Sequence, residues 1–159
     1  MGMIRNIEWD VVVIGSANTD YLGHGPKLPT PGSSVEGDIF QQATGGKGAN
    51  QAIAAARLGA KVALIARVGN DSGGNNLLDQ LAIEGVDKRY VIRDAQIPTG
   101  IALIMVGEKG EKQTLFFPGA NSNLAIEDVN AAKGMLESAR VVGADRRAGG
   151  DSFYRNQDR

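Results

Sequence analysis

The sequence of 159 residues predicts an α/β protein in which a parallel sheet is covered by helices. Residues 11–14 are an apolar run, and residues 61–66 are apolar after Lys61; such runs suit strands that are buried on both faces. Each run precedes a helix-forming segment, and this alternation is typical of right-handed crossover units. Residues 99–117 then break the alternation with two strand-like runs, which predict a β-hairpin.

The first elements can be followed along the chain. After the strand at 11–14, residues 15–20 are polar and turn-prone. Pro26, Pro29 and Pro31 exclude a regular helix from the stretch that follows, because proline lacks the backbone N–H that a helix uses. Residues 35–41 predict a short strand.

Two helices are predicted from their composition and their ends. Residues 52–58 are mostly alanine, a strong helix former, and Gly59 is a good C-terminal stop. Asp71 can cap a helix over residues 75–84, whose leucines give it one apolar side and which Gly85 ends.

The last third of the chain changes character. Residues 99–106 and 113–117 predict the hairpin, because the segment between them is polar and contains glycine. Residues 126–138 predict a helix, and residues 140–142 open another strand. Residues 143–159 are rich in arginine and aspartate, so we expect a domain over residues 1–142 followed by a disordered or frameshifted tail.

The composition excludes several classes of protein. There are 17 Lys and Arg against 18 Asp and Glu, which leaves no basic footprint for nucleic acid. No apolar run approaches the roughly 20 residues that cross a bilayer. Cysteine is absent and His24 is the single histidine, so we expect no disulfide, no thiolate nucleophile and no metal site. The first ten residues lack the apolar core of a signal peptide, which favours a cytoplasmic protein.

Glycine is unusually frequent, with 22 residues in 159 against an average of about 7%. Gly45 and Gly46 stand with Lys47 at the start of the alanine-rich helix, in a spacing that fits neither a Walker A loop nor a dinucleotide fingerprint. Backbone N–H groups at a helix N-terminus are unsatisfied, so they can hold a polyhydroxylated or anionic ligand. A plain tight turn is the alternative interpretation.

Two polar side chains follow the first strand at alternate positions. Asn18 and Asp20 come just after its carboxyl end, which is the edge where open α/β sheets bind ligands. A carboxylate accepts hydrogen bonds and an amide both donates and accepts, so the two could hold neighbouring hydroxyls of a sugar. They could equally be ordinary turn formers.

Residues 45–52, preceded by Asn18-x-Asp20, resemble the first signature of the ribokinase-type (PfkB) carbohydrate kinases. The resemblance implies the N-terminal part of a ribokinase-like three-layer sandwich that carries a small β-sheet lid. The lid would be formed by residues 33–42 and 99–117. The similarity covers residues 11–142, with shorter motifs at residues 29–32, 69–71, 99–102 and 118–121.

The same resemblance implies an activity and a set of ligands. Members of the family transfer phosphate from ATP to a sugar such as D-ribose, giving ribose 5-phosphate, and they use Mg²⁺ and a monovalent cation, K⁺. A homodimer formed through the lid is implied as well. Carried over by position, the sugar-binding residues would be Asn18, Asp20, Gly45, Gly46, Lys47, Asn50, Ala102 and Thr114.

The sequence departs from the family pattern in its second half. We expect the C-terminal half, with the catalytic aspartate and the sites for ATP, Mg²⁺ and K⁺, to be missing, together with an acidic sugar contact near Val141. Asp151 follows a Gly-Gly pair that is similar to the family's catalytic motif, but the order of glycine and alanine differs, so we expect no catalytic residue. Three hypotheses remain: a truncated kinase that is inactive alone, a non-catalytic sugar-binding fragment, and a non-functional truncated gene product.

Overall fold

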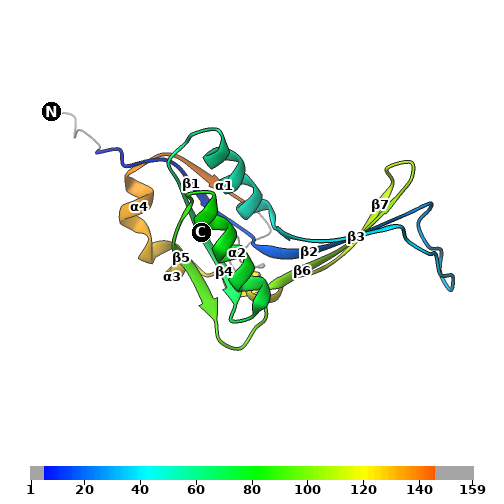
Figure 1. Cartoon of the computed structure of the whole chain (residues 1–159). Coiled ribbons are helices and arrows are strands. Elements are labelled where there is room, and N and C mark those ends of the chain that lie inside the picture. The colour runs from blue at the N-terminus through cyan, green and yellow to red at the C-terminus, as the bar shows by residue number, and fades with distance from the viewer. Residues whose placement is uncertain (1–5, 146–159) are drawn as a thin grey trace, which may run out of the picture.

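The computed structural model describes residues 6–145, which form an α/β body with a β-sheet arm projecting from it (Figure 1). The elements in chain order are β1 (Trp9–Ile14), β2 (Asn18–Gly25), β3 (Ile39–Gly45), α1 (Lys47–Arg57), β4 (Val62–Gly69), α2 (Ser72–Ile83), β5 (Asp87–Asp94), β6 (Gly100–Gly107), β7 (Lys112–Phe117), a 3₁₀ helix η1 (Gly119–Asn123), α3 (Ile126–Ala131), α4 (Lys133–Glu137) and β8 (Ala139–Ala144). No helix within residues 6–145 is long and apolar enough to cross a membrane.

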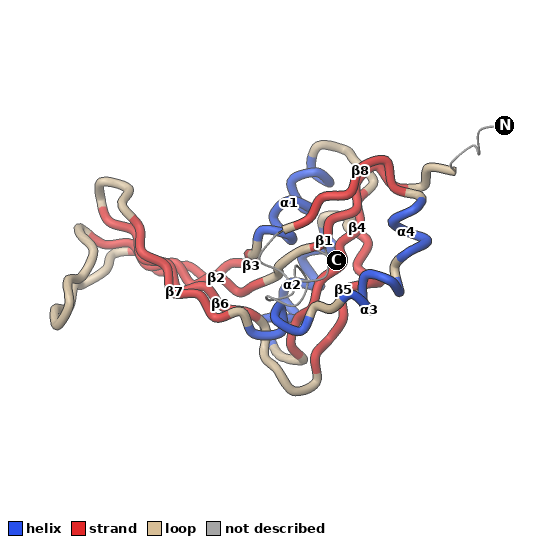
Figure 2. Tube along the Cα trace, turned by 180° about the vertical axis from the view of Figure 1, so that it is seen from behind, coloured by secondary structure: helices blue, strands red, loops and turns tan. Residues whose placement is uncertain are grey.

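The body is a four-stranded parallel sheet in the order β5-β4-β1-β8, with helices on both faces. Successive side chains of a strand point to opposite faces, and β1 shows the result. Val13 packs with α1 and α2 on one face, whereas Val12 packs with Met135 of α4 on the other. Figure 2 shows α3 and α4 on the face opposite α1 and α2. The predicted α/β fold with three layers is confirmed.

The arm is a second four-stranded sheet in the order β3-β2-β6-β7, which we call the lid. Strands β2 and β6 run parallel, while β3 and β7 pair antiparallel on the outside. Only three residues, Gly15 to Ala17, separate the end of β1 from the start of β2. The chain therefore passes from the body into the lid almost without a loop.

Two strands, β2 and β5, were not predicted from the sequence, because neither contains a long buried apolar run. Residues 18–25 were expected to begin as a turn, yet they form β2, which is paired on both sides by β3 and β6. Its polar and glycine residues carry no apolar run, so backbone pairing rather than core burial defines the strand. Residues 87–94 form the edge strand β5, in which Val91 is the one buried apolar side chain.

Two other elements differ from expectation. The short strand expected at residues 35–41 lies later, as β3. The helix expected over residues 126–138 is divided at Ala132, whose φ of −91° and ψ of 10° interrupt the helical geometry.

Gly143 and Ala144, which were expected to belong to a tail, are part of strand β8. Strand β8 continues through Gly143 and Ala144 because both still pair with β1. Its side chains Val141 and Val142 are 54% and 47% exposed. They belong to opposite faces of the sheet.

An ion-pair cluster ties the body together on the side of α3. Arg67 of β4 donates two hydrogen bonds to Asp128, at 2.7 and 2.9 Å, and reaches Asp94 at 3.5 Å. A hydrogen bond from Asn123, then those from the backbone of Gln96 and Ile97, lower the pKa of Asp94 to about 2. Burial raises the pKa of Asp128, but the hydrogen bonds from Arg67 and from the Ala125 N–H, together with the charge of Arg67, outweigh burial, and the pKa lies below its usual value.

Acid is expected to destabilise the fold through this cluster. A carboxyl whose pKa is lower in the folded state stabilises the fold above its unfolded pKa of 3.8, and this stabilisation is lost as the pH falls toward about 2. Thermal unfolding should show the melting temperature falling between pH 5 and pH 2, with a shallower dependence in Asp94→Asn. The exposed Asp79 provides the control, because Asp79→Asn should keep the wild-type slope. Equal slopes in all three proteins would contradict the role of the cluster.

Candidate functional site

The candidate site lies where the two sheets meet, at the carboxyl end of β1. Ligands of open α/β sheets bind at this edge. The short connection Gly15 to Ala17 brings Asn18 and Asp20 of β2 directly beyond it, and the Gly46 turn at the start of α1 faces the same region. Figure 1 shows β2, β3 and β6 leaving the body together at this point.

A cavity of about 180 Å³ occupies this junction. It gathers side chains from the body and from three lid strands, and all the predicted site residues except Gly45 line it. The lid register explains how the apolar members arrive, because Asp20 of β2 lies beside Ala102 of β6, which in turn faces Phe116 of β7. The lining residues are Ser16, Asn18, Asp20, Gly46, Lys47, Asn50, Ala102, Thr114 and Phe116.

Asp20 is the most unusual group in the cavity. Its Oδ1 atom is buried and accepts no hydrogen bond from any residue between 6 and 145. Burial raises the pKa of this carboxyl above its usual value. Buried polar atoms are almost always paired, and an unpaired one therefore indicates a place for a missing partner.

The two glycines have different tasks. Gly45 lies against the Asp20 carboxylate, and a Cβ atom at position 45 would overlap it. Gly46 has a φ of 94° and a ψ of 138°, a conformation that is essentially restricted to glycine. A Cβ atom at Gly46 would also press on the backbone of Ser16 and Ala17. Both positions therefore require glycine, the first for the carboxylate and the second for the turn into α1.

The N-terminus of α1 offers fewer free donors than the sequence suggested. The backbone N–H of Lys47 donates to the Ser16 hydroxyl at 3.1 Å, and the N–H of Ala49 donates to the Ser16 carbonyl at 3.0 Å. Ser16 thus satisfies part of the helix end that was expected to be open to a ligand. The side chains of Lys47 and Asn50 are exposed at this end of the helix, so they, more than the backbone, are available to a ligand.

Three residues near the cavity were not predicted. Ser16 and Phe116 line it. Asp145 follows β8 and accepts hydrogen bonds from the hydroxyl and the N–H of Ser16. The sequence analysis expected the acidic sugar contact near Val141 to be missing, and the structure places the carboxylate of Asp145 beside Ser16, directly after β8. Asp145 was missed because it opens a charged segment that was interpreted as a tail.

The remaining predicted features lie elsewhere. Asp151 lies outside the described residues. Within residues 6–145, no cluster of three or more His, Cys, Asp or Glu side chains could hold a metal ion.

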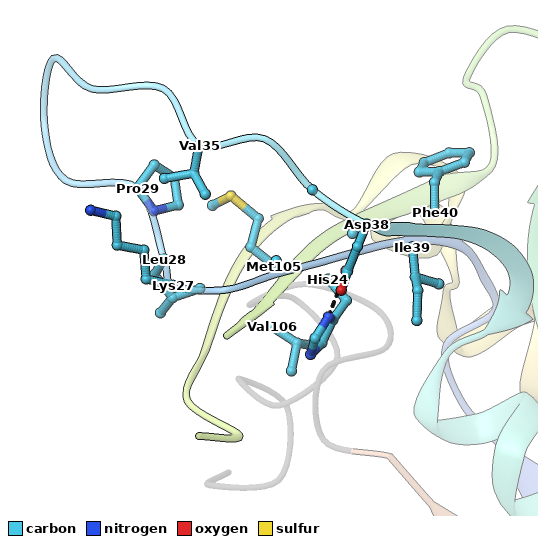
Figure 3. A pocket seen from close by; sticks show the side chains of 13 residues that line it. His24, Lys27, Leu28, Pro29, Val35, Asp38, Ile39, Phe40, Met105 and Val106 are labelled. Atoms are coloured by element: carbon cyan, nitrogen blue, oxygen red, sulfur yellow. Dashed lines mark hydrogen bonds and ion pairs between the residues drawn. The ribbon is translucent and has the colours of Figure 1, made fainter. Parts of the chain in front are cut away.

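A second cavity, of about 370 Å³, is found at the far end of the lid (Figure 3). Its lining is largely apolar, with Leu28, Val35 and Met105 among the side chains. It includes a hydrogen bond of 2.7 Å between His24 Nδ1 and Asp38 Oδ1. No predicted sugar-binding residue lines this cavity, which is separate from the candidate site.

Comparison with known proteins gives the family. The sequence pattern of the pfkB family of carbohydrate kinases matches residues 9–146 of this chain. This chain therefore belongs to that family of sugar kinases. The resemblance that rested on the Gly-Gly-Lys and Asn-x-Asp motifs is confirmed.

Among its relatives, the ribokinase of Mus musculus is 38% identical over 132 residues, which are 83% of this chain and 41% of the relative. The solved structure of the Giardia lamblia ribokinase has a TM-score of 0.81 and 29% identity over 87% of this chain and 42% of its own. The Arabidopsis thaliana ribokinase complexed with ribose and ATP has a TM-score of 0.71 and 29% identity, over 87% of this chain and 46% of its own. The chain thus spans less than half the length of these proteins.

Gly46→Ala is expected to lower the free energy of unfolding by about 1–3 kcal/mol, because alanine is strained in this conformation. The substitution should also weaken the binding of any ligand in the cavity. Urea unfolding measures the first effect. Gly59 is a matched control, because its φ is also positive, at 89°, but the space around it is open. Gly59→Ala should cost about 1 kcal/mol and leave the cavity intact. Equal losses would show that contact with Ser16 and Ala17 is unimportant.

Proposed function

We propose that residues 9–145 form the sugar-binding part of a ribokinase-type kinase and that the sugar is D-ribose or a close relative. The observation that carries the proposal is the buried, unpaired Oδ1 atom of Asp20 in a cavity lined by amide, hydroxyl and ammonium side chains. Such an atom needs a hydrogen-bond donor, and a hydroxyl group of a sugar supplies one.

The lining has the chemistry that a neutral polyol requires. Asp20 accepts from hydroxyls, the amides of Asn18 and Asn50 donate and accept, and the Lys47 ammonium donates. Ala102 and Phe116 provide an apolar wall, which suits the C–H face of a sugar ring. A nucleotide phosphate would instead be repelled by the Asp20 carboxylate, so the cavity favours the sugar over ATP.

The relatives support the assignment of the reaction. The Arabidopsis thaliana ribokinase has been solved with ribose and ATP, and the Cryptococcus neoformans ribokinase with ADP. We propose that this chain takes part in ATP-dependent phosphorylation of the sugar by holding the acceptor. The groups that bind ATP, Mg²⁺ and K⁺ and supply the catalytic base would belong to the part of the relatives that this chain does not span. The chain alone would therefore bind sugar without transferring phosphate.

Asp20→Asn should weaken ribose binding, measured by isothermal titration calorimetry, by about tenfold to a hundredfold, because a hydrogen bond to a charged acceptor contributes about 1.5–3 kcal/mol. Wild-type affinity should also fall on acidification, and it should begin to fall at a higher pH than an ordinary aspartate would give. The raised pKa of Asp20 is the reason, since the protonated carboxyl loses its charge as an acceptor.

The control is Asp38→Asn, which removes a lid carboxylate that lines the other cavity and should leave ribose binding unchanged. A flat titration from a wild-type sample that melts cooperatively would contradict the sugar site and would favour a non-functional product. Phosphorylation of ribose with ATP by the chain alone would contradict the proposed division of roles.

We also propose that the lid joins two copies of the chain. Cross-strand pairing places Phe40, Leu103, Leu115 and Phe117 on the lid face opposite Asp20. Each of these side chains is at least 41% exposed. A contiguous apolar face of this kind marks an interaction surface.

Sedimentation velocity should show a dimer for the wild type. Leu115→Asp should give a monomer, because a charge would be buried in the apolar interface. Gln41→Asp, on the exposed opposite face of β3, is the matched control and should remain a dimer. A wild-type monomer at all concentrations would overturn this assignment of the lid.

A further inference from the structure

Asn121 lies behind the candidate site and makes an unusual number of hydrogen bonds for one amide. It belongs to the 3₁₀ helix η1, and its side chain is only 1% exposed. Its Oδ1 atom accepts from the N–H of Ala17 at 2.8 Å. Its Nδ2 atom contacts three acceptors, at 3.1 Å to the Ala17 carbonyl, 2.8 Å to the Pro118 carbonyl and 2.8 Å to Asn18 Oδ1.

These contacts leave the Asn121 amide a single orientation. A backbone N–H can only donate, so the atom that faces the N–H of Ala17 must be the oxygen. The nitrogen must then face the two backbone carbonyls, which can only accept. A flipped amide would set donor against donor and acceptor against acceptor in a buried position, where each unpaired group is costly.

The orientation of Asn121 fixes that of Asn18. Because the Asn121 nitrogen is a donor, the Asn18 atom that it meets must be the oxygen. The Asn18 nitrogen is left for the other direction, and it donates to no acceptor within residues 6–145. Asn18 lines the cavity, so the site presents an N–H donor close to the Asp20 acceptor.

Gly100 makes room for the two amides to meet. Asn18 of β2 is paired with Gly100 of β6, and a Cβ atom at Gly100 would overlap both Asn121 Nδ2 and Asn18 Oδ1. A side chain at position 100 would therefore separate the pair. The contact between Asn121 and Asn18 depends on an independent feature of the lid, which indicates that it is built into the fold.

We propose that Asn121 is a positioning residue that sets the Asn18 amide with its nitrogen toward the ligand. Asn121 itself does not touch the ligand. The site then selects a ligand with two neighbouring oxygens, one that accepts from Asn18 and one that donates to Asp20, which is the pattern of a vicinal diol. The ligand part of this inference rests on the proposed sugar-binding function, whereas the orientation of the two amides does not.

The orientation is tested first without ligand and without any variant. Side-chain amide hydrogen exchange, followed by NMR, should show the Asn121 NH₂ protected and the Asn18 NH₂ exchanging at least about tenfold faster, since hydrogen bonding and burial slow exchange. Equal protection of the two amides would overturn the proposal. This result stands whether or not ribose binds.

The second test is a double-mutant cycle on ribose affinity. Asn18→Ala and Asn121→Ser should each weaken binding by about two- to tenfold, and the double variant should be no weaker than Asn18→Ala alone, because Asn121 acts through Asn18. Additive losses would overturn the proposal by showing a separate structural effect.

Asn123→Ala is the matched control for the cycle. Asn123 is in the same 3₁₀ helix but donates to Asp94 at 2.7 Å, so its loss should lower the melting temperature and leave ribose affinity unchanged. If ribose does not bind the folded wild type, the proposed function fails while the exchange measurement still decides the role of Asn121. That measurement also decides it if Asn121→Ser does not fold.

Discussion

The arrangement of the whole molecule depends on how the backbone of Ser16 and Ala17 is held. Ser16 accepts hydrogen bonds from two N–H groups of the first turn of α1 and donates to Asp145 beyond β8. The side chain of Asn121 is hydrogen-bonded to both the N–H and the carbonyl of Ala17. Ser16 and Ala17, together with Gly15, make up the connection between β1 and β2. Their fixed geometry therefore sets the direction in which β2 leaves the body. The cavity lies directly beyond this connection, and Ser16 is part of its lining.

The sequence predicted those parts of the fold that have a local cause. The β-branched run in β1, the alanines of α1 and the Asp71 cap of α2 each act through neighbours a few residues away, and each was found where expected. Strand β2 was missed because its identity as a strand comes from pairing with β3 and β6, residues far along the chain.

The candidate site divides in the same way. Asn18 and Asp20 belong to one short motif and Gly46 and Lys47 to another, and the structure brings the two motifs to one cavity. Three residues reach the site only through folding. Asn121 bonds to Ala17, 104 positions away, and Asp145 bonds to Ser16, 129 positions away. Phe116 lines the cavity although more than 60 positions separate it from Asn50. Asn121 belongs to the motif at residues 118–121, but no local pattern shows what any of the three residues contacts, because their partners are not neighbours in sequence.

The open side of β8 has a consequence for handling the protein in solution. Within residues 6–145 this strand pairs with β1 alone, and Val141 and Val142 leave both of its faces partly bare. An unpaired strand edge is a template for further strands from any chain, and a bare apolar flank strengthens the attachment. The described residues 6–145 therefore leave two surfaces open to association at opposite ends, the proposed lid interface and the β8 edge. Growth through both at once has no closed symmetry and leads to chains of molecules rather than to a discrete particle.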